Sequence, residues 1–344
     1  MSFLSYKLKY IFLNEIEEKT MCTAISYFAN GHYFGRNLDV EFDPEESVTI
    51  SPRRYPFDFH SSKESKEHLA MIGMAHILDG YPLYFDATNE KGLSAAALSF
   101  PGEAVYHRKN TDLINLAPWE VIPFILGACE TAAQAKHLLS KTNLTDEKFR
   151  EDIPLTPLHF LIADKKETFV AEPTANGLCI RENPIGLLTN SPPFDFQMQY
   201  LHLFMGLSNN PVENRFSKEI DFQEISRGMG ALGLPGDLSS PSRFVRAAFT
   251  KFHSLKGQDE AHDIRQFFHI LSSVEQQKGC VRVGDAFEFT AYSSCCDTRK
   301  GIYYYKTYDN FSIVGVDMYR EDLSGEEIVI YPVIRKGGFA VLNQ

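Results

Sequence analysis

Residues 21–39 read MCTAISYFANGHYFGRNLD, and the interpretation of the whole chain starts from this stretch. Positions 22–29 and 33–36 are mostly apolar or alternating, and turn residues separate the two runs. Short runs of this kind, bounded by turn residues, are typical of strands. The stretch therefore predicts two consecutive strands, the first of which begins at Cys22.

Outside this stretch, blocks of predicted strands alternate with blocks of predicted helices. A serine followed by proline, Ser240-Pro241, predicts a further helix start, because proline fits the first helical turn at little cost. The segment 264–274 places its apolar residues on one face, as a helix facing a core does. Strands are predicted at 47–51, 70–75, 92–98, 158–163, 169–172, 186–189, 287–293, 302–307 and 328–333, and helices at 119–128, 131–140, 194–207 and 264–274.

This order predicts α+β layers and not a doubly wound parallel sheet. The 344 residues are 44% hydrophobic, which is enough for a large buried core. The sequence contains no proline-rich linker, low-complexity tract or internal repeat, so a single catalytic or binding domain is expected.

Charge and hydropathy exclude several kinds of partner. The formal net charge is -11, and a protein with this balance lacks the basic surface that binds nucleic acid. No apolar run reaches 18 residues, so no membrane-spanning helix and no membrane association are expected. The apolar stretch 10–13 is too short for a secretory signal, and Glu15 follows it closely. A cytoplasmic protein is therefore expected.

Metal and cofactor motifs are missing from the sequence. The six cysteines include no C-x-x-C pair, and the eleven histidines include no H-E-x-x-H motif. The glycines between 228 and 236 lack the spacing of a phosphate-binding loop. We therefore expect no metal and no cofactor, and most cysteines should be inert buried thiols.

Cys22 differs from the other cysteines because Met21 precedes it. If translation began at Met21, removal of the methionine would leave Cys22 with both a thiol and a free α-amine. The reference pKa values of these groups are about 8.5 and about 7.7–8.0, so the amine can act as general base for the thiol. Nearby, Asp39 would orient the ammonium and Arg36 would favour the thiolate. An ordinary ion pair at a strand end would explain Arg36 and Asp39 equally well.

Further motifs extend the pattern in chain order. They are Met21-Cys22-Thr23, the sequence GRNLD at 35–39, YPLY at 81–84, NEKGL at 89–93, LTNSP at 188–192, GLPGD at 233–237, SRF at 242–244, FFHILSSVEQQ at 267–277 and YSSCC at 292–296. Together these motifs resemble the choloylglycine hydrolase family, which comprises bile salt hydrolases and penicillin V acylases. The resemblance implies an N-terminal nucleophile hydrolase with a four-layered αββα fold. The later motifs are similar to those of Gram-positive bile salt hydrolases.

The resemblance also implies a role for five polar residues. Cys22 would be the nucleophile, Asp39 would bind its α-ammonium group, and Arg36 would steady the thiol. Asn190 would donate a hydrogen bond to the oxyanion of the tetrahedral intermediate, and Arg243 would complete the polar network. Loss of one preorganised donor to an oxyanion typically costs on the order of 100-fold or more in rate.

Ser99 stands where many members of the family carry asparagine. The resemblance implies that a backbone N–H at this position contributes to the oxyanion hole, and serine keeps that group. The apolar wall of the binding site is expected from the family pattern at five positions. These are Leu38, Leu78, Phe85, Phe149 and Ile153.

The first 21 residues conflict with this chemistry. In the chain as written, the nitrogen of Cys22 is an amide, which cannot act as a base. Residues 1–21 are therefore expected to be either an upstream extension, with translation beginning at Met21, or a removable pro-segment. The position of Met21 directly before Cys22 favours the first. Residues 22–344 would then form the catalytic domain.

The resemblance implies hydrolysis of the amide that joins a bile acid to glycine or taurine, through a thioester on Cys22. It also implies a homotetramer and small-molecule conjugated bile salts as substrates. An acylase for penicillin V or other N-acyl amides, such as acyl-homoserine lactones, is the alternative among enzymes. A non-catalytic binder of amphipathic ligands that keeps residues 1–21 is the alternative outside them.

Overall fold

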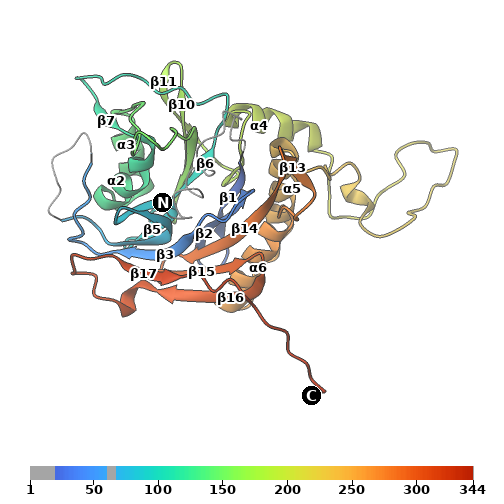
Figure 1. The fold of residues 1–344 in the computed structure, drawn as a ribbon. Coiled ribbons are helices and arrows are strands. Elements are labelled where there is room, and N and C mark those ends of the chain that lie inside the picture. Colours follow the sequence, from blue (N-terminus) through green and yellow to red (C-terminus); the bar gives the residue numbers. More distant parts are fainter. Residues whose placement is uncertain (1–19, 60–66, 344) are drawn as a thin grey trace.

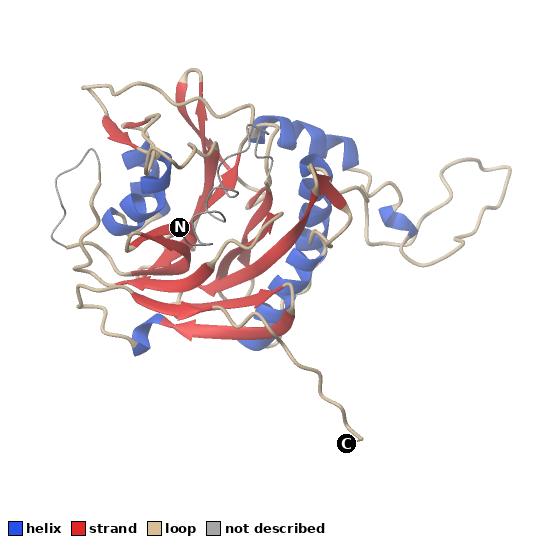
Figure 2. Cartoon of the chain, viewed as in Figure 1, coloured by secondary structure: helices blue, strands red, loops and turns tan. Residues whose placement is uncertain are grey.

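The structure, a computed structural model, describes residues 20–59 and 67–343 and places two large sheets face to face (Figure 1). Helices cover the outer face of each sheet, which Figure 2 shows as blue ribbons on both sides of the red strands. The predicted α+β class with αββα layers is confirmed. Within the described residues, no helix is both long enough and apolar enough to cross a membrane.

The first sheet carries the N-terminal part of the described chain. Its strands run in the order β12-β1-β2-β14-β15-β16, with β13 paired to β14, and all pairings are antiparallel. The bounds are β1 Met21–Phe28, β2 His32–Val40, β12 Leu187–Leu188, β13 Val281–Val283, β14 Ala286–Asp297, β15 Ile302–Thr307 and β16 Asn310–Asp317.

The second sheet has the order β11-β10-β9-β6-β5-β4-β3-β17 and is also antiparallel throughout. The bounds are β3 Glu46–Ser51, β4 Met71–Leu78, β5 Tyr81–Asn89, β6 Ser94–Ser99, β9 Leu158–Ala163, β10 Thr168–Thr174, β11 Gly177–Glu182 and β17 Val329–Pro332. A separate parallel pair joins β7 (Ile114–Leu116) to β8 (Thr142–Leu144).

Each sheet is covered by its own pair of helices. Helices α2 (Val121–Ala128) and α3 (Ala132–Leu139) contact the second sheet. Helices α5 (Ser240–His253) and α6 (Glu260–Ser272) contact the first sheet, and α4 (Phe194–Leu201) packs against α5. Single 3-10 turns lie at Pro118–Glu120, His202–Phe204, Met229–Ala231 and Met318–Arg320.

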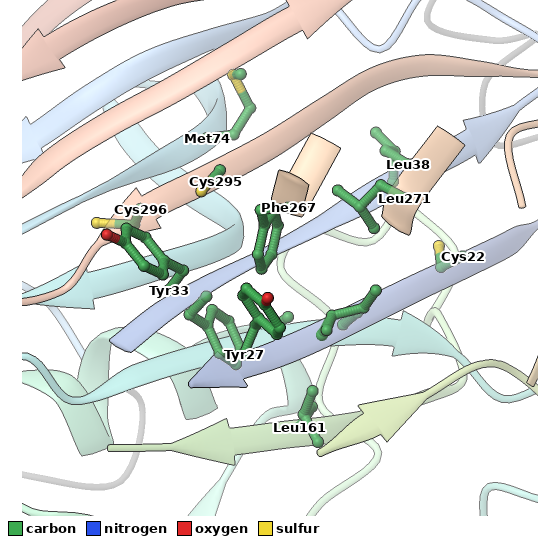
Figure 3. Packing of buried hydrophobic residues seen from close by; sticks show 14 of the residues in the cluster. Cys22, Tyr27, Tyr33, Leu38, Met74, Leu161, Phe267, Leu271, Cys295 and Cys296 are labelled. Atoms are coloured by element: carbon green, nitrogen blue, oxygen red, sulfur yellow. The ribbon is translucent and has the colours of Figure 1, made fainter. Parts of the chain in front are cut away.

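Buried apolar side chains form two clusters that follow this layering. One joins the first sheet to α5 and α6 and to the facing side of the second sheet, and the other lies between the second sheet and α2 and α3. Figure 3 shows Cys22 on β1 within the first cluster, on the same sheet as Leu38. The candidate nucleophile therefore belongs to the rigid interior and not to a loop.

Gly35 explains how closely β2 and β14 approach. A Cβ atom at this position would lie 2.0 Å from the backbone oxygen of Ser294. Only glycine leaves room for the two paired strands to lie this close. The register of β2 against β14, on which the positions of Arg36 and Asp39 depend, thus requires glycine at the start of the GRNLD motif.

Six strands were not expected from the sequence: β5, β7, β8, β11, β13 and β16. Pro82 and the polar Asp86 and Thr88 interrupt the apolar pattern of β5, although both polar residues are buried and hydrogen bonded. The helix predicted at 194–207 is shorter, because α4 ends at Leu201 and a 3-10 turn follows. Beyond it, the segment 205–236 projects from the body, as does the C-terminal segment after 333 (Figure 1).

Candidate active site

Cys22 lies at the second position of β1, directly opposite Leu38 of β2. It is 2% exposed, and it lines an apolar cavity between the two sheets and α2. The Arg36 guanidinium donates a hydrogen bond to its sulfur through Nη2. The thiol is therefore buried against a cation at the edge of a cavity, an arrangement suited to nucleophilic attack on a bound ligand.

Arg36 is fully buried and held by backbone carbonyl groups of three strands. Its Nη1 donates to the carbonyl oxygen of Phe85 at 3.0 Å and to that of Ala97, and Nε donates to that of Asn37 at 3.3 Å. These contacts fix the planar guanidinium so that Nη2 faces the sulfur. Burial raises the pKa of the Cys22 thiol, and the Arg36 charge opposes this rise.

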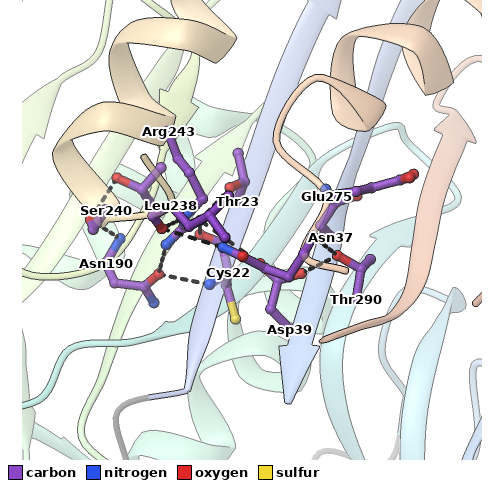
Figure 4. Close-up of polar contacts among 12 residues, drawn as sticks. Cys22, Thr23, Asn37, Asp39, Asn190, Leu238, Ser240, Arg243, Glu275 and Thr290 are labelled. Atoms are coloured by element: carbon purple, nitrogen blue, oxygen red, sulfur yellow. Dashed lines mark hydrogen bonds and ion pairs between the residues drawn. The ribbon is translucent and has the colours of Figure 1, made fainter. Parts of the chain in front are cut away.

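Asn190 and Arg243 surround the backbone of Cys22 (Figure 4). The backbone N–H of Cys22 donates to Asn190 Oδ1 at 2.7 Å, and Arg243 Nη2 donates to the same oxygen at 2.7 Å. Arg243 Nη1 also donates to the carbonyl oxygen of Cys22 and to Thr23 Oγ1, both at 2.6 Å. Arg243, on helix α5, thus orients the first residues of β1.

Asp39 is buried near this network. Thr290 Oγ1 donates to its Oδ1 at 2.6 Å, and Arg243 Nη1 lies 3.9 Å from its Oδ2. Among the described residues, Oδ2 has no hydrogen-bond partner. Burial raises the pKa of Asp39 to about 6, while Arg243 and the Thr290 hydroxyl lower it.

Ser99 contributes through its backbone. Its N–H lies close enough to lower the pKa of the Cys22 thiol, and its carbonyl oxygen accepts a hydrogen bond from Asn190 Nδ2 at 2.8 Å. The same Nδ2 donates to the carbonyl oxygen of Thr20 at 3.3 Å. The Ser99 N–H and the Asn190 amide, which is bonded to Ser99, therefore supply two N–H donors near the start of β1, as an oxyanion hole requires.

His159 contacts the backbone of the loop that carries Asn190. Its Nε2 donates to the carbonyl oxygen of Thr189 at 2.9 Å, and its Nδ1 lies 3.1 Å from Glu172 Oε1. The imidazole also stacks on Phe100, with ring centroids 4.2 Å apart. Three buried side chains thus fix the backbone directly before Asn190.

Four of the five expected apolar wall residues line the cavity: Leu38, Phe85, Phe149 and Ile153. Leu78 does not, so this prediction is wrong. It occupies the last position of β4, directly before the turn at Asp79, and the cavity extends only as far as His76 on that strand. Leu78 lies two residues farther along β4, past the last residue of that strand that lines the cavity.

Several site residues carried no signal in the sequence. Thr290 and Ser240 are hydrogen-bonding partners of Asp39 and of the Asn190 backbone, but lone hydroxyl residues occur throughout the chain. The apolar wall also includes residues that resemble ordinary core positions. These are Val40, Phe42, Leu83, Tyr84, Trp119 and Ile122.

Residues 20–59 and 67–343 form no cluster of side chains that could hold a metal ion. No group of three or more histidine, cysteine, aspartate or glutamate side chains converges in these ranges. The polar groups around Cys22 are a thiol, two guanidinium groups, an amide and a carboxyl group, which together favour nucleophilic chemistry on a carbonyl group.

Two stacked antiparallel sheets between helical layers, with a cysteine at the start of an inner strand, define the class of N-terminal nucleophile hydrolases. Residues 22–331 match the family described as linear amide C–N hydrolases, choloylglycine hydrolase family. The chain belongs to this family, and it is accordingly a hydrolase of linear amide C–N bonds.

Relatives and solved structures agree with this assignment. A bile salt hydrolase/transferase of Lactiplantibacillus plantarum is 49% identical over 94% of this chain and 100% of its own length. One from Clostridium perfringens is 35% identical over 90% and 96% of the two chains.

A crystal structure of a variant conjugated bile acid hydrolase from Clostridium perfringens has a TM-score of 0.88 at 34% identity, covering 94% and 100% of the two chains. Penicillin V acylase from Agrobacterium tumefaciens shares the fold, with a TM-score of 0.71 at 20% identity over 89% and 90%.

Proposed function

We propose that the protein hydrolyses the amide bond of glycine- or taurine-conjugated bile salts, with Cys22 as the nucleophile. The main support for this proposal is the contact between the Cys22 sulfur and the Arg36 guanidinium at the edge of an apolar cavity. The cavity suits the apolar face of a steroid, and a few polar groups beside it suit an amide. The similarity to bile salt hydrolases over most of the chain supports the substrate class.

The mechanism begins with the free α-amine of Cys22, which takes the thiol proton. The sulfur then attacks the amide carbonyl carbon and forms a tetrahedral intermediate with negative charge on oxygen. When the C–N bond breaks, the ammonium passes its proton to the departing glycine or taurine nitrogen. Water next attacks the thioester, so the bile acid leaves and the thiol is regenerated.

The remaining polar residues hold this arrangement. Asn190 Nδ2 and the backbone N–H of Ser99 stabilise the oxyanion, Arg36 favours the thiolate, and Asp39 binds the α-ammonium group. Arg243 keeps the Cys22 backbone and Asn190 in register through its three short hydrogen bonds.

The active chain starts at Cys22, with Met21 as the favoured translation start. The contacts of Thr20 support this. Its carbonyl oxygen accepts a hydrogen bond from Asn190 Nδ2, the group proposed to bind the oxyanion. Thr20 also lines the cavity. A chain that retains Thr20 would therefore compete with its own substrate, in addition to lacking a free amine.

The test is to express the chain from Met21, confirm by intact mass that it begins at Cys22, and assay glycocholate and taurocholate. Cys22→Ala should abolish release of glycine and taurine, while Cys280→Ala, at an exposed thiol, should not change it. Full activity in Cys22→Ala would overturn the mechanism. A preference for penicillin V or an acyl-homoserine lactone in the same assay would replace the proposed substrate.

The proposed assembly is a homotetramer in the cytoplasm. The projecting segment 205–236 supports self-association, because it exposes large apolar side chains that a solitary chain would leave in water. These include Met205, Phe216, Ile225 and Leu232.

A further inference from the structure

A second cavity, beside Thr20 and Met21, contains a buried carboxyl group that the proposed mechanism does not use. Glu288 on β14 is 0% exposed, and it lines this cavity together with Thr20, Met21 and Asn190. Within residues 20–59 and 67–343, neither of its carboxyl oxygens has a hydrogen-bond partner. A buried carboxyl group left in this state costs free energy, so a functional partner is expected for it.

The register of the first sheet brings Glu288 close to Asp39. Thr290 and Met21 lie opposite Asp39 on either side of β2. Because side chains alternate along a strand, Glu288 and Thr290 point to the same face, and that is the face from which Thr290 reaches Asp39. Asp39 Oδ2 is likewise without a hydrogen-bond partner in the described ranges. Two incompletely satisfied carboxyl groups therefore lie beside the start of β1.

The charges around Glu288 favour an additional cation. Burial, and next the Asp39 carboxylate, raise the pKa of Glu288 to about 8, and Glu41 acts in the same direction. Arg243 and the backbone N–H of Met21 act in the opposite direction and lower the pKa of Glu288. Neither makes a hydrogen bond to the Glu288 carboxyl oxygens. Arg282 also lines the cavity, from β13.

Arg243 directs four of its five N–H groups to acceptors other than Glu288, including one from Nε to the carbonyl oxygen of Leu238. Its Nη1 already donates to Cys22 and Thr23, and its Nη2 donates to Asn190. A new positive charge at the Cys22 nitrogen would lie near this guanidinium and the two carboxyl groups. The α-ammonium of a chain that starts at Cys22 is such a charge.

We propose that Glu288 is a positioning residue that, together with Asp39, receives the α-ammonium group of Cys22 in the processed chain. The inference rests on the proposed start at Cys22. Asn190 Oδ1, which is 2.7 Å from the Cys22 nitrogen, fixes one direction of the amine, and Glu288 fixes another. The two carboxylates keep the ammonium formed after proton transfer next to the thiolate.

The test compares pH profiles of kcat/KM for glycocholate, using protein expressed from Met21 and shown by mass to begin at Cys22. Removal of a neighbouring carboxylate lowers the pKa of an ammonium, so E288Q should move the acid limb down by about 1 pH unit. Asp285→Asn is the matched control, because it removes an exposed carboxylate three positions away on the same hairpin and should leave the limb in place. An unchanged limb in E288Q would overturn the inference.

A second measurement separates this inference from the proposed function. In protein labelled with ¹³C-cysteine, the Cα shift of Cys22 reports the pKa of the α-amine whether or not the enzyme turns over bile salts. The amine pKa should be lower in E288Q than in the wild type. If E288Q does not fold, Glu288→Asp should give a smaller decrease, and equal amine pKa values would reject Glu288. Failure of the wild type to hydrolyse any amide would reject the proposed function instead.

Discussion

The carboxyl group of Glu288 makes the stability of the unprocessed chain depend on pH. Its pKa is about 8 in the folded chain against 4.5 for an ordinary glutamate. The folded state therefore holds this proton more tightly than the unfolded state, so the contribution of Glu288 to stability is lost as pH rises from about 4.5 to about 8.

Replacing Glu288 by glutamine in the full 344-residue chain should remove this dependence. The difference in unfolding free energy between E288Q and the wild type should grow in favour of E288Q, by up to about 1.4 kcal/mol per pH unit between pH 5 and 8. Urea unfolding at pH 5, 6.5 and 8 measures it. A constant difference across these values would show that Glu288 does not titrate in this range.

Asn190→Ala tests the oxyanion donor. The substitution removes Nδ2 and should lower kcat for glycocholate by on the order of 100-fold. Binding should change less, because the apolar cavity is untouched. Asn176→Ala, at an exposed turn, is the control and should keep the wild-type kcat. Equal kcat values in the two variants would assign oxyanion stabilisation to other donors.

The sequence allowed prediction of the polar residues of the site but not of its shape. Cys22, Arg36, Asp39, Asn190 and Arg243 were expected together through family motifs, and the structure brings them together. Their convergence depends on contacts between residues as far apart as Cys22 and Arg243, which local spacing does not encode. Leu78 was misplaced because apolar side chains give the same pattern whether they face a core or a ligand.

At the level of strands, Gly35 limits how β2 packs on β14. Gly35→Ala would place a Cβ atom 2.0 Å from the Ser294 carbonyl oxygen. The crowding should lower the unfolding free energy by about 1–3 kcal/mol or more and reduce activity by moving Arg36. Urea unfolding measures the first effect. Gly206→Ala, where no heavy atom lies within 4 Å of the added carbon, should be near neutral. Equal stability of the two variants would contradict the close approach.

Strand prediction succeeded for several strands with apolar runs and failed at β5, whose buried face is partly polar. β1, β9 and β15 have apolar runs and were expected. β5 was not, because its buried Asp86 accepts hydrogen bonds from Tyr292, Ser294 and Tyr303, all far away in the sequence. A buried polar strand is recognisable only when its partners are known.

The projecting segment 205–236 exposes large apolar side chains outside the two-sheet body. If it mediates the proposed tetramer, Phe216→Ser combined with Ile225→Ser should reduce the mass measured by light scattering from four chains towards one. Both side chains are exposed in the single chain. Phe311→Ser, at an exposed position of β16, is the matched control and should remain tetrameric. An unchanged mass in the double variant would place the interface elsewhere.

The start of β1 and the C-terminal segment differ in whether they can carry a fused tag. The nitrogen of Cys22 is enclosed by Asn190 and must carry no acyl group to serve as a base, whereas the segment after 333 leads away from both sheets (Figure 1). Purification handles and fluorescent fusions therefore belong after Gln344. Any such fusion placed before Cys22 and left uncleaved should give a folded but inactive protein. A negative assay of that protein would not report on the activity of the native enzyme.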